Sequence, residues 1–353
     1  MTRLILLFSL LGCALLSAGS ANEARRIQRD YDLAHQAWLA AIQQAADPAA
    51  QARAWAQRPD PNETGRALWN EIKANLSESW TIEPAVWILA NAPDIAFPVA
   101  QPGEPPVAVQ PASVIRRAVE KFHTLSPKVG PYCIGITLGN DPKAFALLEL
   151  IEAKNPSEEV QGAAALGQAL LLRKLGDTPK IQRQRIEKIR QAVIKSADLP
   201  VLKTTVARLA ESELFTIRYL SVDRTAPDIQ GQDAAGEKFK LSDYRGEVVV
   251  LFFWNTWMPD AEASLKLMRD LHGKLAGKKA RIIGVNQDRL ATLRQMTADE
   301  SSPWRNFSDS EQLIAQRYHI LRYPKIFVLD QEGVIRYIGD PGAFIELSVN
   351  ALL

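Results

Sequence analysis

A run of seven apolar residues, Val248 to Trp254, constrains the fold of this chain more than any other feature. Valine, phenylalanine and tryptophan favour strands, and an unbroken apolar run indicates a strand that is buried on both faces. After this run the sequence pattern alternates between helices and strands, over 260–275, 281–286, 289–296, 325–330 and 334–338. The last two segments flank Gln331-Glu332-Gly333 and predict a hairpin. This order predicts a mixed α/β sheet with helices on both faces.

The sequence before residue 221 has a different, mostly helical period. Apolar residues recur at steps of three and four from Tyr31 through Ala34 to Trp38. Prolines stand at or near the starts of several segments, where a missing N–H has no cost. The clearest helical segments are 144–153, 158–175, 181–196 and 201–220. Segments of this length predict an all-α half built of helical hairpins.

The length of 353 residues suits two domains rather than one. We expect a helical domain over 21–221 and an α/β domain over 222–353. Six prolines fall within 91–111. Because proline disrupts a helix interior, this stretch predicts an extended, exposed linker inside the helical domain.

The first twenty residues have the features of a signal peptide. Arg3 supplies a positive start, and an apolar run too short to span a bilayer ends in small residues, which suits cleavage after Ser20 or Ala21. Leu10-Leu11-Gly12-Cys13 resembles a lipoprotein box, so acylation of Cys13 is the alternative. The mature protein is expected to be exported to the periplasm or cell envelope, with a membrane link only through a lipid at Cys13.

Composition excludes several classes of function. The chain has 42 Lys and Arg against 40 Asp and Glu, a net charge of +2, which argues against a nucleic-acid partner. Its four histidines lie far apart with no cysteine nearby, so no metal site with local ligand spacing is expected. Nothing in the sequence calls for a cofactor.

Once Cys13 is removed or acylated, Cys133 is the remaining thiol and has no partner for an intramolecular disulfide. Its neighbours are apolar, which indicates a buried structural thiol. Five tryptophans in the helical half indicate core packing, with a ligand-binding surface as the alternative. They are Trp38, Trp55, Trp69, Trp80 and Trp87. The basic run from Arg173 to Arg190 indicates a solvated helix face, with a surface for an acidic partner as the alternative.

The last third carries a recognisable set of motifs. In order, they are Ala226-Pro227-Asp228, Leu241-Ser242-Asp243-Tyr244-Arg245-Gly246, Phe253-Trp254-Asn255-Thr256-Trp257 and Tyr323-Pro324. Their order and spacing resemble the TlpA/ResA-type thiol-disulfide oxidoreductases, within the wider redoxin or AhpC-TSA group. The resemblance implies a thioredoxin-like fold from about residue 222 nearly to the C-terminus.

The sequence departs from that family where the family's chemistry takes place. The family places Cys-x-x-Cys directly after its tryptophan, at a helix start that lowers the pKa of the first thiol. Here these positions hold Met258-Pro259-Asp260-Ala261, and the buried acid of many relatives falls on Phe252. No catalytic residue is therefore predicted, and a peroxiredoxin reaction, which also begins at a thiolate, is excluded for the same reason.

The same positions suggest a binding site instead. Pro324 matches the family's cis-proline, which would present backbone from Tyr323 to an extended peptide. Trp257, Met258, Pro259, Tyr323 and Pro324 are therefore predicted to form an apolar groove. The alternative is that these residues simply pack an inactive site.

Three functional hypotheses follow. The first is an exported, redox-inactive protein that binds a protein or peptide. The second is a thiol-disulfide oxidoreductase-type enzyme that uses Cys133 or the cysteines of a partner. The third is a structural envelope component tethered through Cys13.

Overall fold

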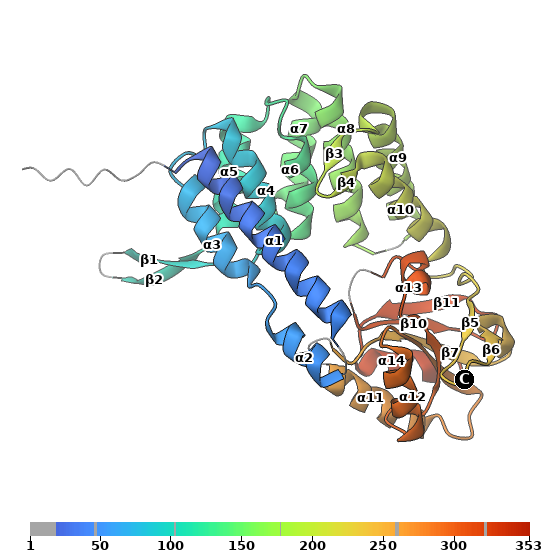
Figure 1. Ribbon diagram of the computed structural model, residues 1–353. Helices are drawn as coiled ribbons and strands as arrows, with labels where there is room; N and C mark the ends of the chain where they lie inside the picture. The colour runs from blue at the N-terminus through green and yellow to red at the C-terminus, as the bar shows by residue number, and fades with distance from the viewer. Residues whose placement is uncertain (1–18, 46–47, 102–103, 177, 258–260, 321–322) are drawn as a thin grey trace, which may run out of the picture.

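The structure is a computed structural model that describes residues 19–45, 48–101, 104–176, 178–257, 261–320 and 323–353. A helix-rich half is followed by an α/β half (Figure 1). The principal helices of the first half are α1 (Ala21–Gln44), α2 (Pro48–Ala56), α3 (Pro61–Ile72), α4 (Ile82–Asn91), α5 (Pro111–Ala118), α6 (Gly130–Gly135), α7 (Ala144–Lys154), α8 (Glu158–Arg173), α9 (Pro179–Ser196) and α10 (Val206–Tyr219). The proposed signal peptide and Cys13 lie outside the described residues.

Local sequence explains how several of these helices begin. Proline occupies the first turn of α3, α5 and α9, and the Ser157 side chain accepts a bond from the Val160 N–H at the start of α8. The middle of α8 is buried throughout Ala163, Ala164 and Ala165, because α7 and α9 pack closely on either side. The predicted helix over 201–220 is shorter than expected. A short hairpin, β3 (Pro200–Val201) with β4 (Thr204–Thr205), precedes α10.

The expected linker over 91–111 has more structure than the sequence indicated. It forms an antiparallel hairpin of β1 (Phe97–Gln101) and β2 (Glu104–Val109), which projects from the helical half (Figure 1). The prediction of extended backbone is correct, and the two extended segments also pair with each other. Proline excludes a helix yet is compatible with a two-stranded ribbon, in which every strand is an edge strand.

The α/β half contains one five-stranded sheet in the order β11-β10-β7-β8-β9. Its strands are β7 (Val248–Trp254), β8 (Ala280–Asn286), β9 (Arg305–Ser308), β10 (Lys325–Leu329) and β11 (Ile335–Gly339). β7, β8 and β9 are parallel, and β10 runs antiparallel to both β7 and β11. The helices of this half are α11 (Ala261–Lys274), α12 (Leu290–Ala298), α13 (Leu313–Arg317) and α14 (Ala343–Asn350), and a hairpin of β5 (Gln230–Gln232) with β6 (Lys238–Lys240) precedes the sheet.

All seven residues of β7 are buried, as the apolar run predicts. Val248, Val250, Phe252 and Trp254 face one core with α11, α12 and α14. The alternate residues of β7 face a second core, which includes Phe239 of β6. The sheet therefore has two covered faces, as expected of a thioredoxin-like domain.

α1 extends from the helical half toward the α/β half, and α2 follows it (Figure 1). The Trp55 ring of α2 contacts the Trp257 ring directly after β7, with centroids 4.8 Å apart. The tryptophans of the helical half therefore divide into two groups. Trp69 lies in the helical core, whereas Trp55 is half-buried against the other half of the molecule.

The basic run from Arg173 to Arg190 is not a uniformly solvated face. Arg185 is fully buried, and its guanidinium donates to the Glu213 carboxylate at 2.8 Å. Arg173 donates to the other oxygen of Glu213 at 2.6 Å. The expectation is therefore wrong at Arg185, because α10 supplies a buried counter-ion that helical periodicity within α9 does not reveal.

Among the described residues, no helix is both long and apolar enough to cross a bilayer.

Candidate functional site

The candidate site lies at the carboxyl ends of β7 and β8. These parallel strands are in register, with Trp254 opposite Asn286. The residues that follow each strand therefore lie side by side: Asn255 donates through its side chain to Gln287 at 3.3 Å. Ligand sites of open α/β sheets are formed at this end of the strands.

A buried carboxylate holds the backbone after β7 in place. Asp288 has no exposed surface and accepts bonds from the Thr256 hydroxyl at 2.8 Å and the Asn286 amide at 2.7 Å. The Thr256 N–H also donates to this carboxylate. Burial raises the pKa of Asp288, and the donors from Asn286 and Thr256 oppose that rise. The sequence analysis did not identify Asp288, although its position two residues after the predicted strand over 281–286 was a usable signal.

Tyr323 and Pro324 approach from the other side, immediately before β10. The peptide bond between them is cis, as the resemblance implied. The Tyr323 hydroxyl accepts a bond from Gln287 Nε2 at 2.5 Å, and burial raises the pKa of this phenol. Gln287 thus joins the Tyr323 side chain to the turn after β7.

The structure brings together only some of the predicted groove residues. Tyr323 and Pro324 line a cavity of about 10 Å³ with Asn255 and Ala261, among other residues. That volume has room for about one water molecule. Met258 and Pro259 lie outside the described residues. Trp257 is half-buried and contacts Trp55, and its indole Nε1 is buried with no hydrogen-bond partner in the described part of the chain.

The sequence analysis expected the family's thiol and acid positions to fall on Met258, Ala261 and Phe252. Phe252 is fully buried in β7, and Ala261 begins α11. No cysteine occurs in the sequence after Cys133. Across the described ranges there is also no cluster of three or more residues suited to bind a metal.

Cys133 lies on α6 in the helical core and is fully buried. Its thiol donates to the Val129 carbonyl at 3.5 Å, and burial raises its pKa far above the ordinary value of a thiol. The prediction of a buried structural thiol is confirmed.

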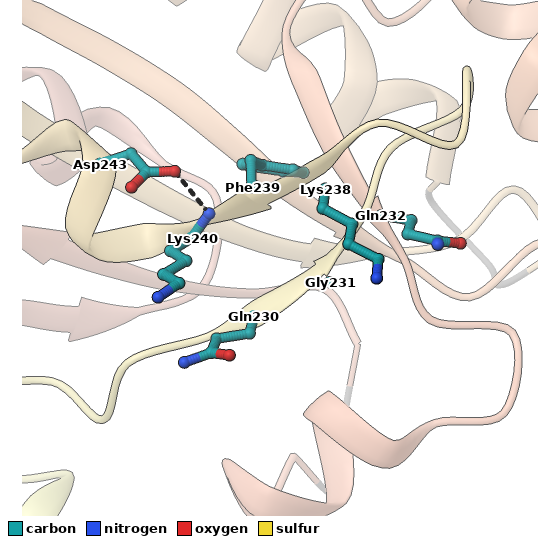
Figure 2. Close-up of a pocket in the computed structure, with 7 residues that line it drawn as sticks. All are labelled: Gln230, Gly231, Gln232, Lys238, Phe239, Lys240 and Asp243. Carbon is teal, nitrogen blue, oxygen red and sulfur yellow. Dashed lines mark hydrogen bonds between the residues drawn. The ribbon is translucent and has the colours of Figure 1, made fainter.

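A second, larger cavity of about 390 Å³ lies on the β5–β6 hairpin. Figure 2 shows Gln230 and Gln232 on one strand, opposite Lys240 and Lys238 on the other. The Lys240 backbone N–H donates to the Asp243 carboxylate at 2.8 Å. The lining also includes the Phe239 ring, and it shares no residue with the cavity beside Pro324.

Comparisons with known proteins concern the α/β half. A family model described as "AhpC/TSA family" matches residues 222–338. The thioredoxin-like protein YneN of Bacillus subtilis is 31% identical over 125 residues, which cover 32% of this chain and 68% of that protein. The thiol-disulfide oxidoreductase ResA of Geobacillus kaustophilus is 26% identical over 156 residues, which cover 43% of this chain and 89% of that protein.

Among solved structures, the thioredoxin domain of a thiol-disulfide oxidoreductase from Bacteroides vulgatus is similar to this chain. It is 23% identical, with a TM-score of 0.34, and the match covers 37% of this chain and 96% of that domain.

Proposed function

The chain belongs to the AhpC/TSA family of thioredoxin-like proteins through its C-terminal half, and we propose that it functions there by binding a protein or peptide rather than by thiol chemistry. The observation that carries this proposal is the location of the one thiol in the described part of the chain. Cys133 is buried in the helical half, and its raised pKa keeps it protonated at neutral pH. Thiol-disulfide exchange requires an accessible thiolate, so Cys133 does not meet that requirement.

The binding site that we propose comprises Trp257, Met258, Pro259, Tyr323 and Pro324. Geometry around the cis peptide supports it. Gln287 fixes the side chain of Tyr323, and Asp288 fixes the backbone of Thr256. Two sides of the proposed groove are therefore positioned by hydrogen bonds before a ligand arrives, which reduces the entropic cost of binding.

The experiment uses an unfolded protein without thiols, reduced and carboxymethylated α-lactalbumin, labelled for fluorescence anisotropy. We expect the wild-type chain to bind it and Tyr323→Ala to weaken binding by about tenfold or more, a typical effect of removing a central aromatic contact. Tyr219→Ala is the matched control, because Tyr219 is an exposed tyrosine on α10. Equal affinities of Tyr323→Ala and wild type would show that the groove is not the binding site.

The relatives named thiol-disulfide oxidoreductases favour a second candidate. In it, a partner supplies both cysteines, and this chain orients the partner's disulfide against the Tyr323–Pro324 backbone. This candidate predicts faster reduction of a partner disulfide by glutathione when the chain is added, whereas the binding proposal predicts an unchanged rate.

We also propose that the protein is exported, either after cleavage near residue 20 or through a lipid on Cys13. In the folded chain Ser20 caps α1: its hydroxyl accepts from the Glu23 N–H, and its own N–H donates to Glu71 at 3.2 Å. Cleavage after Ser20 or Ala21 would remove this cap. The N-terminal mass of the purified protein distinguishes cleavage from acylation, and an intact Met1 would contradict both.

A further inference from the structure

Trp257, within the proposed groove, is covered by a segment of the same chain. The Trp55 ring lies 4.8 Å from the Trp257 ring, with the ring planes inclined by 59°. Behind it, Trp38 of α1 packs on Trp55 at 5.1 Å, and the Trp38 Nε1 donates to the Ala54 carbonyl at 2.9 Å. The Arg58 guanidinium lies 5.6 Å and 5.9 Å from the centroids of the Trp38 and Trp55 rings. α2 therefore presents one tryptophan to the turn after β7.

The contact between Trp55 and Trp257 does not satisfy the hydrogen-bonding group of the Trp257 side chain. Its ring has an aromatic neighbour, but its buried indole N–H has no acceptor among the described residues. A buried N–H without a partner is unfavourable, and any occupant that brings an acceptor satisfies it. A peptide with an aromatic residue in an extended segment has carbonyl groups to offer, whereas those within a helix are largely bonded internally.

The described side chains of α2 also have little burial. None of its described side chains is buried, in contrast to the several buried residues of α3 and α4. α2 packs mainly on α1. Segments with few buried apolar contacts open at low free-energy cost.

We propose that Trp257 is a receptor for an aromatic side chain, that Trp55 of α2 occupies it within the chain, and that a partner displaces α2. The displacing partner is a peptide segment with an aromatic residue, whose backbone carbonyl accepts a bond from the Trp257 indole. This inference rests on the proposed function, since it specifies the ligand chemistry and the regulation of the same groove. Only molecules in which α2 leaves Trp257 accessible can bind the partner. The apparent affinity is therefore the intrinsic affinity multiplied by the fraction of such molecules.

The test uses the full chain and a blocked peptide, acetyl-Ala-Ala-Trp-Ala-Ala-amide, with the all-alanine peptide as its matched control. By calorimetric titration, we expect Trp55→Ala to bind the tryptophan peptide at least tenfold more tightly than wild type, and the Trp55→Ala/Trp257→Ala double variant to lose that gain. Trp80→Ala removes a tryptophan that packs on the helical core, and we expect this variant to bind like wild type. The all-alanine peptide is expected to bind none of these proteins.

A second measurement on the wild-type chain does not depend on the folding of a variant. We expect saturating tryptophan peptide to accelerate tryptic cleavage after Arg53, because displaced α2 becomes accessible. The all-alanine peptide is expected to leave the cleavage rate unchanged.

Each failure has a separate meaning. Equal affinities of wild type and Trp55→Ala, with an unchanged cleavage rate, would overturn occupation by α2 while leaving the groove intact. Tight binding that survives in the double variant would overturn the role of Trp257. If Tyr323→Ala and wild type bind unfolded α-lactalbumin with equal affinity, the proposed function itself is rejected.

Discussion

The carboxylate of Asp288 is enclosed by donors from two strand ends, at Thr256 and Asn286. We predict that Asp288→Ala destabilises the chain by at least ~2 kcal/mol, because each buried donor left without an acceptor costs about 1–3 kcal/mol. Urea unfolding followed by circular dichroism measures the change. Asp270→Ala removes an exposed carboxylate on α11 and is expected to have little effect.

The raised pKa of Asp288 gives the sign of a pH dependence. The folded state favours the protonated carboxyl, so its contribution to stability is complete below the ordinary value of 3.8 and decreases as the pH rises through the folded pKa. The stability difference between wild type and Asp288→Ala should therefore be larger at pH 4 than at pH 7. The opposite order would mean that the ionised form is the preferred one.

Cys133 provides a second prediction at this scale. Because its thiol is fully buried and its pKa is raised, we expect no reaction with Ellman's reagent at pH 8 in the native mature chain. One thiol per chain should react in 6 M guanidinium chloride, after cleavage or acylation has removed Cys13 as a thiol. Rapid reaction under native conditions would restore Cys133 as a candidate nucleophile.

At the scale of helices, α8, α9 and α10 share one buried charge network. Glu213 of α10 pairs with Arg173 and with the fully buried Arg185. We predict that Glu213→Gln destabilises the chain by about 3–5 kcal/mol, because it removes a carboxylate that pairs with a buried guanidinium.

Glu211→Gln is the matched control, because Glu211 lies on the same helix and is exposed. It should change the free energy of unfolding by less than about 0.5 kcal/mol, as surface substitutions usually do. Similar effects of the two substitutions would show that the buried network does not stabilise these helices.

Elements with a strong local pattern could be predicted from the sequence. The seven-residue apolar run predicted a strand that is buried on both faces, as β7 is. The order of strands and helices limited the sheet to a few topologies. The cis bond before Pro324 followed from the resemblance. The hairpin over 97–109 did not, because prolines exclude a helix without showing that two extended segments pair with each other.

Contacts between elements distant in sequence were beyond prediction. Trp55 and Trp257 lie two hundred residues apart, and neither sequence window indicates that the two meet. The tryptophan pattern in the helical half predicts core packing. This prediction is correct for Trp69, whereas Trp55 also contacts Trp257 of the α/β half. Arg185 was misassigned for a similar reason, since its counter-ion comes from another helix.

At the scale of the whole molecule, the contacts between the two halves include two that involve different helices. One is the Trp55–Trp257 pair. At the other, Ser212 of α10 hydrogen bonds with His319 Nδ1 at 2.7 Å, and Phe215 packs on the same imidazole with centroids 4.8 Å apart. The second contact is made by α10 and not by α2, so displacement of α2 can leave the halves joined through α10.

Insulin-disulfide reduction with dithiothreitol tests most directly our proposal that this chain does not catalyse thiol-disulfide exchange. We predict that the wild-type chain leaves the uncatalysed rate unchanged. The double substitution Met258→Cys, Ala261→Cys should introduce activity, and adding Trp55→Ala should increase it further if α2 covers the turn. Reduction of insulin by the wild-type chain itself would contradict the account.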